Sequence, residues 1–293
     1  MPACSAHGTS LIVNMKEYMN TGKQIRLNRF WKNERTFIIP FDHGIHAGVA
    51  EGLEDPERLA ELIVRSPVDG VLVTPGMIKN IAPVIKDLAV MLRIDGAFTS
   101  FTPEPGDFNS LYTVEDALHF GADAVIVMTY IGTPYEQNSL IRLGQTAADG
   151  DHHGMPVAAE ILPPSLLNDH FGRDMHACDD GSMNVLDQIK HITRIGMEHG
   201  ADIIKTRYFG EPQLYKEIIE TAGVPVIVAG GPKKDDTDEA LLQLAYDIVQ
   251  SGAAGIIFGR NVWQHPNVEK IIRAMAVIIH ENETVSKALK LLR

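Results

Sequence analysis

Short apolar runs alternate with amphipathic stretches along this chain, and the alternation recurs about eight times. The apolar runs cover residues 36–41, 70–74, 89–95, 124–129, 156–161, 202–206, 225–229 and 255–259. Runs that are apolar on both faces are typical of parallel strands buried between layers of helix. The stretches between them, such as residues 56–64 and 212–222, carry apolar residues at three- and four-residue spacing, which indicates helices. The pattern therefore predicts an α/β chain built from repeated βα units.

Eight such units within 293 residues favour a closed (β/α)8 TIM barrel. The competing fold is a doubly wound open sheet, but no Gly-x-Gly-x-x-Gly follows the first strand and no Walker-type glycine–lysine loop occurs. We expect one barrel domain over residues 1–293, with an N-terminal extension over 1–32 and an extra C-terminal helix over 283–293. The only long loop that we expect covers residues 163–184.

The charge of the chain limits its partners. A formal net charge of -12 and a pI near 5.4 disfavour binding to nucleic acid or to an anionic membrane, because those partners need excess Lys and Arg. No secretory signal begins the chain, and no run of about 18 apolar residues occurs. Two cysteines, Cys4 and Cys178, are too few for a disulfide framework. We therefore expect a cytoplasmic protein with no nucleic-acid or membrane partner.

Polar residues occur where the predicted strands end. In a (β/α)8 barrel the catalytic groups lie at the carboxyl ends of the strands. Those ends carry, in chain order, Asp42, His43, Arg93, Asp95, Tyr130, Glu160 and Lys205. We predict that these side chains meet at one mouth of the barrel, where His43, Arg93 and Tyr130 are candidate substrate contacts.

Lys205 lies in an apolar strand, Ile203-Ile204-Lys205-Thr206. Burial disfavours the ammonium form and lowers the pKa of the amine, which a lysine needs in order to attack a carbonyl and form an iminium. The alternative is a structural lysine that reaches solvent or forms an ion pair with Asp42 or Glu160. Position alone leaves both interpretations open.

Two carboxylates are the candidate acid/base partners of this lysine. Asp42 ends the first strand, which can project it across the barrel toward the sixth. It could equally be a turn aspartate that precedes Gly44. Glu160 could be a second proton-transfer group, or only the countercharge of Lys205.

Glycine-rich turns follow the last two predicted strands. Gly230 and Gly231 come after the seventh strand, and Gly259 and Arg260 come after the eighth. Barrel enzymes often bind phosphate here, because exposed backbone N–H groups and a following helix N-terminus attract an anion. Arg260 could add a bidentate contact. A Gly-Gly turn by itself is usually only a turn, but two such loops on adjacent strands predict a phosphate site.

Histidines are frequent near the 163–184 loop, where His170 and His176 precede Cys178. None of these pairs has the spacing of a zinc site on a helix, and loop histidines are usually solvated. We therefore expect no metal site.

Together the motifs resemble the archaeal-type class I aldolases, a family that includes fructose-bisphosphate aldolase, aminodideoxyheptulosonate synthase and the autoinducer-processing thiolase. The resemblance covers most of the chain. Its carriers are Phe41-Asp42-His43-Gly44, Ile204-Lys205-Thr206, Ala229-Gly230-Gly231-Pro232-Lys233, Gly259-Arg260-Asn261-Val262-Trp263-Gln264 and His280-Glu281-Asn282-Glu283.

The resemblance implies a (β/α)8 barrel in which Lys205 forms a Schiff base with the substrate and Asp42 assists proton transfer. It implies that the substrate phosphate is held by Gly230, Gly231, Gly259 and Arg260. No metal or organic cofactor is expected, since the iminium itself is the electron sink. A ring-based homo-oligomer, commonly a decamer, is also implied.

One segment departs from the family. Its aldolase members usually carry a tyrosine acid and an arginine at the end of strand five, where this chain has Leu162 and Pro164. The loop that follows is longer than in the archaeal members, which places Asn168, His170 and Arg173 near the substrate. The substrate is therefore expected to differ from fructose bisphosphate.

Three functions stay open on the sequence. The first is Schiff-base cleavage or formation of a carbon–carbon bond in a phosphorylated ketose. The second is acyl transfer from a phosphorylated diketone to coenzyme A, with the same lysine. The third is a noncatalytic barrel that only binds a phosphosugar.

Overall fold

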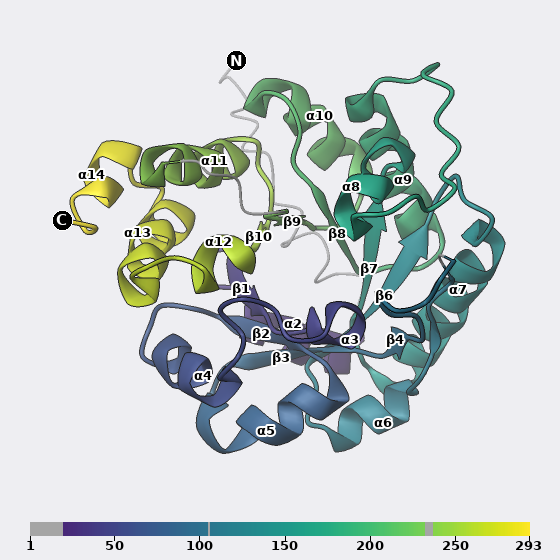
Figure 1. The fold of residues 1–293 in the computed structure, drawn as a ribbon, viewed down its shortest axis with the longest axis horizontal. Coiled ribbons are helices and arrows are strands. Elements are labelled where there is room, and N and C mark those ends of the chain that lie inside the picture. The colour runs from purple at the N-terminus through teal and green to yellow at the C-terminus, as the bar shows by residue number, and fades with distance from the viewer. Residues whose placement is uncertain (1–19, 105, 232–236) are drawn as a thin grey trace, which may run out of the picture.

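Eight parallel strands close into a barrel in the order β1-β10-β9-β8-β7-β6-β3-β2, and helices surround it (Figure 1). This computed structural model describes residues 20–104, 106–231 and 237–293. The barrel strands are β1 (Thr36–Pro40), β2 (Gly70–Val73), β3 (Ala89–Arg93), β6 (Ala124–Tyr130), β7 (Val157–Leu162), β8 (Ile203–Arg207), β9 (Val226–Ala229) and β10 (Gly255–Ile257). The predicted (β/α)8 barrel is confirmed, because the strand pairing closes and leaves no edge.

The outer helices follow the strands in alternation. They are α4 (Pro56–Val64), α5 (Pro75–Ile85), α6 (Val114–His119), α7 (Glu136–His153), α9 (Val185–Glu198), α10 (Pro212–Ala222), α11 (Asp238–Gln250) and α13 (Val268–Glu281). Their starts obey local rules: Asp55 accepts a hydrogen bond from the Arg58 backbone N–H at the start of α4, which satisfies an otherwise unpaired donor. None of the described helices is long and apolar enough to cross a membrane.

Three predicted details were wrong. The segment expected to be a loop over 163–184 contains α8 (Pro164–Phe171), which begins at a proline and ends at Gly172 in a left-handed conformation. The connection between β3 and β6 is also long and carries a small antiparallel pair, β4 (Asp95–Gly96) and β5 (Asn109–Ser110). The final helix, α14 (Val285–Leu289), is shorter than the predicted span.

Helix α2 (Thr21–Phe30) covers the amino ends of the strands. Its Leu27 and Phe30 join the apolar cluster inside the barrel. Lys23, which is buried, lies 2.8 Å from a carboxylate oxygen of Asp202, the residue that precedes β8. Helix α2 therefore covers this end of the barrel.

The inward side chains become charged toward the carboxyl ends of the strands. On β8, Ile203 belongs to the apolar interior, and strand alternation brings Lys205 to the same face two residues later. On β7, Ala158 and Glu160 repeat this step. A charged layer thus lies directly above an apolar one.

Candidate active site

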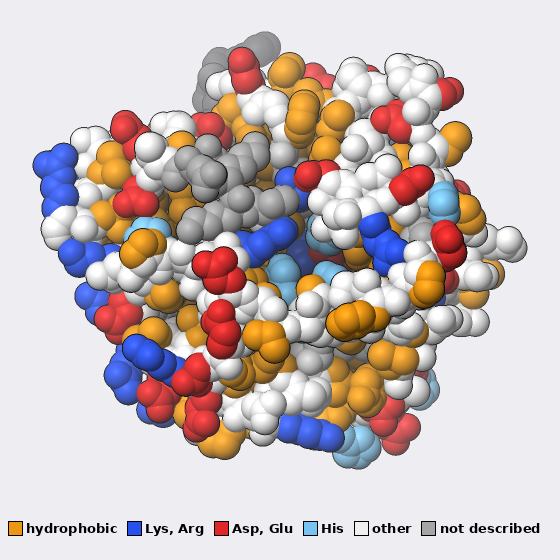
Figure 2. Space-filling model, viewed as in Figure 1, with side chains coloured by type: hydrophobic (Ala, Val, Ile, Leu, Met, Phe, Trp, Pro, Cys, Tyr) orange, Lys and Arg blue, Asp and Glu red, His pale blue; other side chains and the backbone are white. Residues whose placement is uncertain are grey.

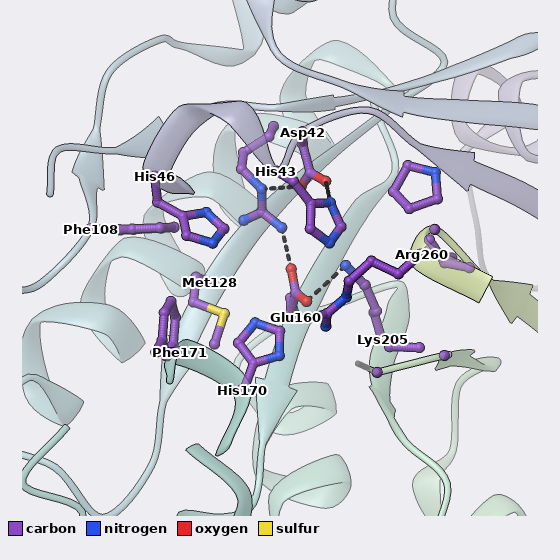
Figure 3. Close-up of a pocket in the computed structure, with 17 residues that line it drawn as sticks. Asp42, His43, His46, Phe108, Met128, Glu160, His170, Phe171, Lys205 and Arg260 are labelled. Atoms are coloured by element: carbon purple, nitrogen blue, oxygen red, sulfur yellow. Dashed lines mark hydrogen bonds and ion pairs between the residues drawn. The ribbon is translucent and has the colours of Figure 1, made fainter. Parts of the chain in front are cut away.

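A cavity opens at the carboxyl ends of the barrel strands (Figure 3). It is lined by Pro40, Asp42, His43, His46, Arg93, Phe108, Met128, Glu160, His170, Phe171, Lys205, Ala229, Gly230, Gly231, Ile257, Gly259 and Arg260. Figure 2 shows this mouth as a hollow near the middle of the face, with Lys or Arg and His side chains inside it. Of the residues that the sequence predicted at the strand ends and in the glycine turns, all but Asp95 and Tyr130 line the cavity.

Lys205 and Glu160 form an ion pair on adjacent strands. Their Cα atoms are register partners in the β7–β8 pairing, so both side chains point inward at the same level. The Lys205 Nζ lies 2.7 Å from the Glu160 Oε1, and both side chains are buried. Burial opposes ionisation of Glu160, but Lys205 and Arg93 lower its pKa to about 2. Lys205 is therefore buried beside a carboxylate, and not only among the apolar neighbours on its strand.

Arg93 connects three carboxylates. Its Nε donates to the Asp42 Oδ2 at 2.7 Å and its Nη1 donates to the Asp95 Oδ1 at 3.1 Å. Its Nη2 donates to Glu160. Burial alone would raise the pKa of Asp42, but Arg93, a hydrogen bond from His43 and the charge of Lys205 hold it well below its usual range. Each of the three nitrogen atoms of Arg93 donates to a different carboxylate. Arg93 therefore positions these carboxylates and is less available to contact a substrate.

Three histidines line the cavity. His43 packs edge-on against Trp263, with 5.1 Å between the ring centroids. Burial and the charge of the nearby His43 together lower the pKa of His46 to about 4. Burial also lowers the pKa of His170 to about 3, with Glu160 acting against this shift and Lys205 reinforcing it. His46 and His170 are therefore neutral at physiological pH.

The two glycine turns bring their backbones against arginine side chains. A Cβ atom on Gly231, whose φ is +72°, would lie 2.5 Å from the guanidinium carbon of Arg207. Burial lowers the pKa of Arg260, and the charge of Arg207 lowers it further, which means that the two cations are close. The carboxylate facing Arg207 is that of Asp169, 3.8 Å away and 60% exposed. Two weakly neutralised guanidinium groups beside glycine backbone are suited to an anion.

The helix dipole contributes less here than the sequence predicted. The helix after β10, α12 (Arg260–Trp263), has only four residues. Pro232 and Lys233 of the other loop lie outside the described residues. Among the described residues, the positive charge of this region comes from Arg207 and Arg260.

The structure places Tyr130 outside the cavity lining. Its side chain is fully buried, and its ring packs against Phe108, Tyr135 and Phe171. It is the register partner of Leu162, which is also buried in this cluster. Phe108 and Phe171 line the cavity and also pack against the Tyr130 ring. These two rings, the aromatic layer, therefore separate Tyr130 from a substrate.

Helix α8 brings part of the predicted loop into the site. His170 and Phe171 line the cavity. Arg173 lines an adjoining outer chamber and donates to the backbone carbonyls of Thr102 and Pro103. Asn168 does not reach either space and instead accepts a hydrogen bond from the Met175 backbone N–H.

Among the contributors that sequence reasoning did not predict are Arg207, Phe108, Met128 and Phe171. Arg207 could have been found, because it follows Lys205 by two residues on one strand and so shares its face. The other three carried no local signal. Across the described ranges 20–104, 106–231 and 237–293, no three His, Cys, Asp or Glu side chains gather as a metal ion would require.

The model of the DeoC/LacD family of aldolases matches residues 36–265, which span the barrel from β1 to the turn after α12. The chain belongs to this family. It is therefore an enzyme of the aldolase class. The family is the one that the motifs of the sequence resemble.

Two relatives of this aldolase carry the same name. The 2-amino-3,7-dideoxy-D-threo-hept-6-ulosonate synthase 1 of Archaeoglobus fulgidus is 34% identical over 263 residues, covering 89% of this chain and 92% of that protein. The synthase of that name from Halobacterium salinarum is 32% identical over 270 residues, covering 92% and 96%.

Among solved structures, a Schiff-base-forming fructose-1,6-bisphosphate aldolase superposes with a TM-score of 0.74. It is 27% identical in sequence, and the match covers 88% of this chain and 99% of that one. The aldolase family and its Schiff-base-forming neighbour thus agree with the lysine-centred cavity.

Proposed function

We propose that this aldolase makes or breaks a carbon–carbon bond in a phosphorylated ketose through a Schiff base on Lys205. The observation that carries the proposal is the buried Lys205–Glu160 pair in a cavity whose other wall holds Gly231 and Arg260. An amine, a proton acceptor and an anion site therefore share one space.

The reaction begins when Lys205 passes a proton to Glu160, 2.7 Å away, and attacks the substrate carbonyl. Loss of water from the carbinolamine gives the iminium. In the cleavage direction the carbon–carbon bond breaks, its electron pair enters the iminium to form an enamine, and an aldehyde leaves. Protonation of the enamine and hydrolysis then release the ketone.

Asp42 supports this sequence electrostatically. Its carboxylate is held ionised by Arg93 and lies close enough to Lys205 for the lysine to lower its pKa. A fixed negative charge stabilises the positive iminium where it forms. The predicted role of Asp42 in proton transfer therefore becomes stabilisation of charge, because the oxygen bonded to Arg93 is a weak base.

The anion site supports a phosphorylated substrate. Arg207 and Arg260 together can hold a phosphate dianion against the backbone of Gly230 and Gly231. At the end of β7 the chain has Leu162 in the apolar cluster and Pro164 at the start of α8. Neither supplies a cation, which supports a substrate with one phosphate rather than two.

The test is chemical trapping. Borohydride and dihydroxyacetone phosphate should add the reduced ketone to Lys205, identified by peptide mass spectrometry, and Lys205→Met should abolish the adduct. The matched control is Lys190→Met, which removes a partly exposed lysine on α9 and should leave trapping intact. Absence of a Lys205 adduct with several phosphorylated ketones would refute the proposal.

A second candidate is carbon–carbon bond formation of the kind named for the archaeal relatives, a 2-amino-3,7-dideoxy-D-threo-hept-6-ulosonate synthase. The 32% and 34% identities favour it. A synthase assay with that product as the readout, run beside cleavage of phosphorylated ketoses, separates the two.

The third candidate is acyl transfer to coenzyme A, which would use the same lysine. If it is correct, turnover should depend on coenzyme A, whose thiol accepts the acyl group. Adding and omitting coenzyme A tests it directly. From the resemblance we also propose that the protein is cytoplasmic and forms a homo-oligomer, as large as a decamer. Sedimentation measures the size of this oligomer.

A further inference from the structure

The proposed reaction needs a group that takes the hydroxyl proton during cleavage and later protonates the enamine. The strand-five position offers Leu162, which is buried in an apolar cluster. Tyr130 on the neighbouring strand lies behind the aromatic layer. The group must therefore be found among the side chains that line the cavity.

The carboxylates of the cavity are already engaged. Glu160 is bonded to Lys205 through Oε1 and to Arg93 through Oε2. Asp42 is bonded to Arg93 through Oδ2, and its Oδ1 lies 3.5 Å from the His43 Nδ1. In the proposed reaction Glu160 already serves the proton of Lys205, and the Asp42 oxygen bonded to Arg93 gains little by taking a further proton. The remaining candidates are the three imidazoles.

His170 is the imidazole positioned for this task. It lies near the end of α8, and Figure 3 shows its ring directed into the cavity toward Glu160 and Lys205. The charges of Glu160 and Lys205, with those of Arg207 and His46, act on the pKa of His170. His46 faces a different set, formed by His43, Asp42, Arg93 and Glu160.

The ring of His170 packs against a neighbouring ring, but one of its nitrogen atoms has no hydrogen bond in the described part of the chain. It packs edge-on against Phe171, with 4.8 Å between centroids. Its Nδ1 is fully buried and has no hydrogen-bond partner in the described part of the chain. A buried polar atom without a partner costs free energy unless a ligand supplies one. A substrate hydroxyl in the cavity could supply the missing partner of this ring nitrogen.

The geometry points to His170 as the proton-transfer residue of the carbon–carbon bond step, an inference that rests on the proposed Schiff-base function. In cleavage, the imidazole takes the hydroxyl proton of the iminium substrate. The O–H electron pair forms the aldehyde carbonyl, and the broken carbon–carbon pair enters the iminium to give the enamine. The imidazolium then returns its proton to the enamine carbon, and water hydrolyses the restored iminium.

The charge state of the ring agrees with this sequence. Burial lowers the pKa of His170 to about 3, so the resting ring is neutral and keeps a lone pair. Once protonated in such a site, an imidazolium is a strong acid and returns its proton readily to carbon. The neutral resting ring therefore has a lone pair for the hydroxyl proton, and the low pKa favours the return of that proton to carbon.

The experiment separates Schiff-base formation from bond cleavage. His170→Gln and His170→Asn are compared with the unmodified enzyme in borohydride trapping at Lys205 with dihydroxyacetone phosphate. They are then compared in cleavage of fructose 1-phosphate and in solvent deuterium exchange into dihydroxyacetone phosphate. His191→Gln, an exposed histidine on α9, is the control. Both His170 variants should retain trapping, while cleavage and exchange fall about 100- to 10,000-fold.

A further variant tests the position directly. In His170→Ala, added imidazole should restore part of the cleavage rate, since a small base can occupy the vacated space. Tyr130→Phe tests the rival proton donor and should stay near the unmodified rate.

The outcomes are distinguishable. Loss of trapping in the unmodified enzyme defeats the proposed function itself. Retained trapping with cleavage within about threefold of the unmodified rate overturns the assignment of His170. Loss of trapping in folded His170 variants also overturns it, because the residue would then serve binding. Loss of cleavage in Tyr130→Phe alone transfers the role to Tyr130.

Discussion

Glu160 and Lys205 face each other across the β7–β8 pairing, with Oε1 and Nζ 2.7 Å apart. Parallel register places the two Cα atoms opposite each other, so this contact is set by the sheet and needs no loop to form. A lysine held in this way has a carboxylate in contact before a substrate arrives.

Glu160→Gln should slow Schiff-base formation. The amide keeps the shape of the side chain but cannot accept the ammonium proton, so the rate of borohydride-trapped adduct formation should fall about 100-fold or more. The control is Glu217→Gln, which removes an exposed carboxylate paired with Lys190 and should leave the rate unchanged. An undiminished rate in Glu160→Gln would show that another group accepts the proton.

Arg207→Gln and Arg260→Gln should weaken phosphate binding. Each removes a cation from the glycine turns, and a hydrogen bond to a charged group is worth about 1.5–3 kcal/mol, so KM should rise about 10- to 100-fold. The KM of a dephosphorylated ketose should stay as it was, because that substrate never uses the site. Equal losses for both substrates would show that the arginines support the fold instead. Arg194→Gln, an exposed arginine on α9, serves as the control.

The stability of the fold should decline as the pH falls below about 6.5. His46 and His170 have folded-state pKa values of about 4 and about 3, below the ordinary value near 6.5, so protons favour the unfolded chain in that range. The pKa of Glu160, about 2 when folded, lies below its unfolded value near 4.3. Its contribution is complete above that unfolded value and is lost as the pH approaches 2.

Urea unfolding at a series of pH values between 7.5 and 3 measures this decline. His170→Gln should flatten the curve between pH 6.5 and 3, the range set by the two His170 pKa values. The exposed-histidine variant His191→Gln should reproduce the unmodified curve. Parallel curves for all three proteins would contradict the assigned burial of the imidazole.

Much of the architecture follows from local sequence. Helices α4 and α10 begin and end at the predicted residues, because a proline at the first turn and apolar spacing mark them without any distant contact. The strands follow from runs that are apolar on both faces. Helix α8 was missed because its eight residues lie among polar loop residues and carry a short apolar pattern.

The candidate site divides in the same way. Strand ends and glycine turns determined that Lys205, Glu160 and Gly231 would share one mouth, since every strand of a parallel barrel ends on the same side. The groups that surround the Lys205 amine could not be predicted from the sequence. Whether it met apolar groups or a carboxylate depended on the β7–β8 register, which involves residues 45 positions apart.

The sequence by itself determined the barrel, the lysine and the glycine turns, because these depend on periodicity and on residue type. Tertiary structure alone decided that Arg207 lies against Gly231, that Tyr130 is enclosed by aromatic rings, and that α8 delivers His170. The physical reason is range: secondary structure reflects neighbours a few residues away, whereas the polarity of a cavity is the sum of side chains brought from seven strands and their loops.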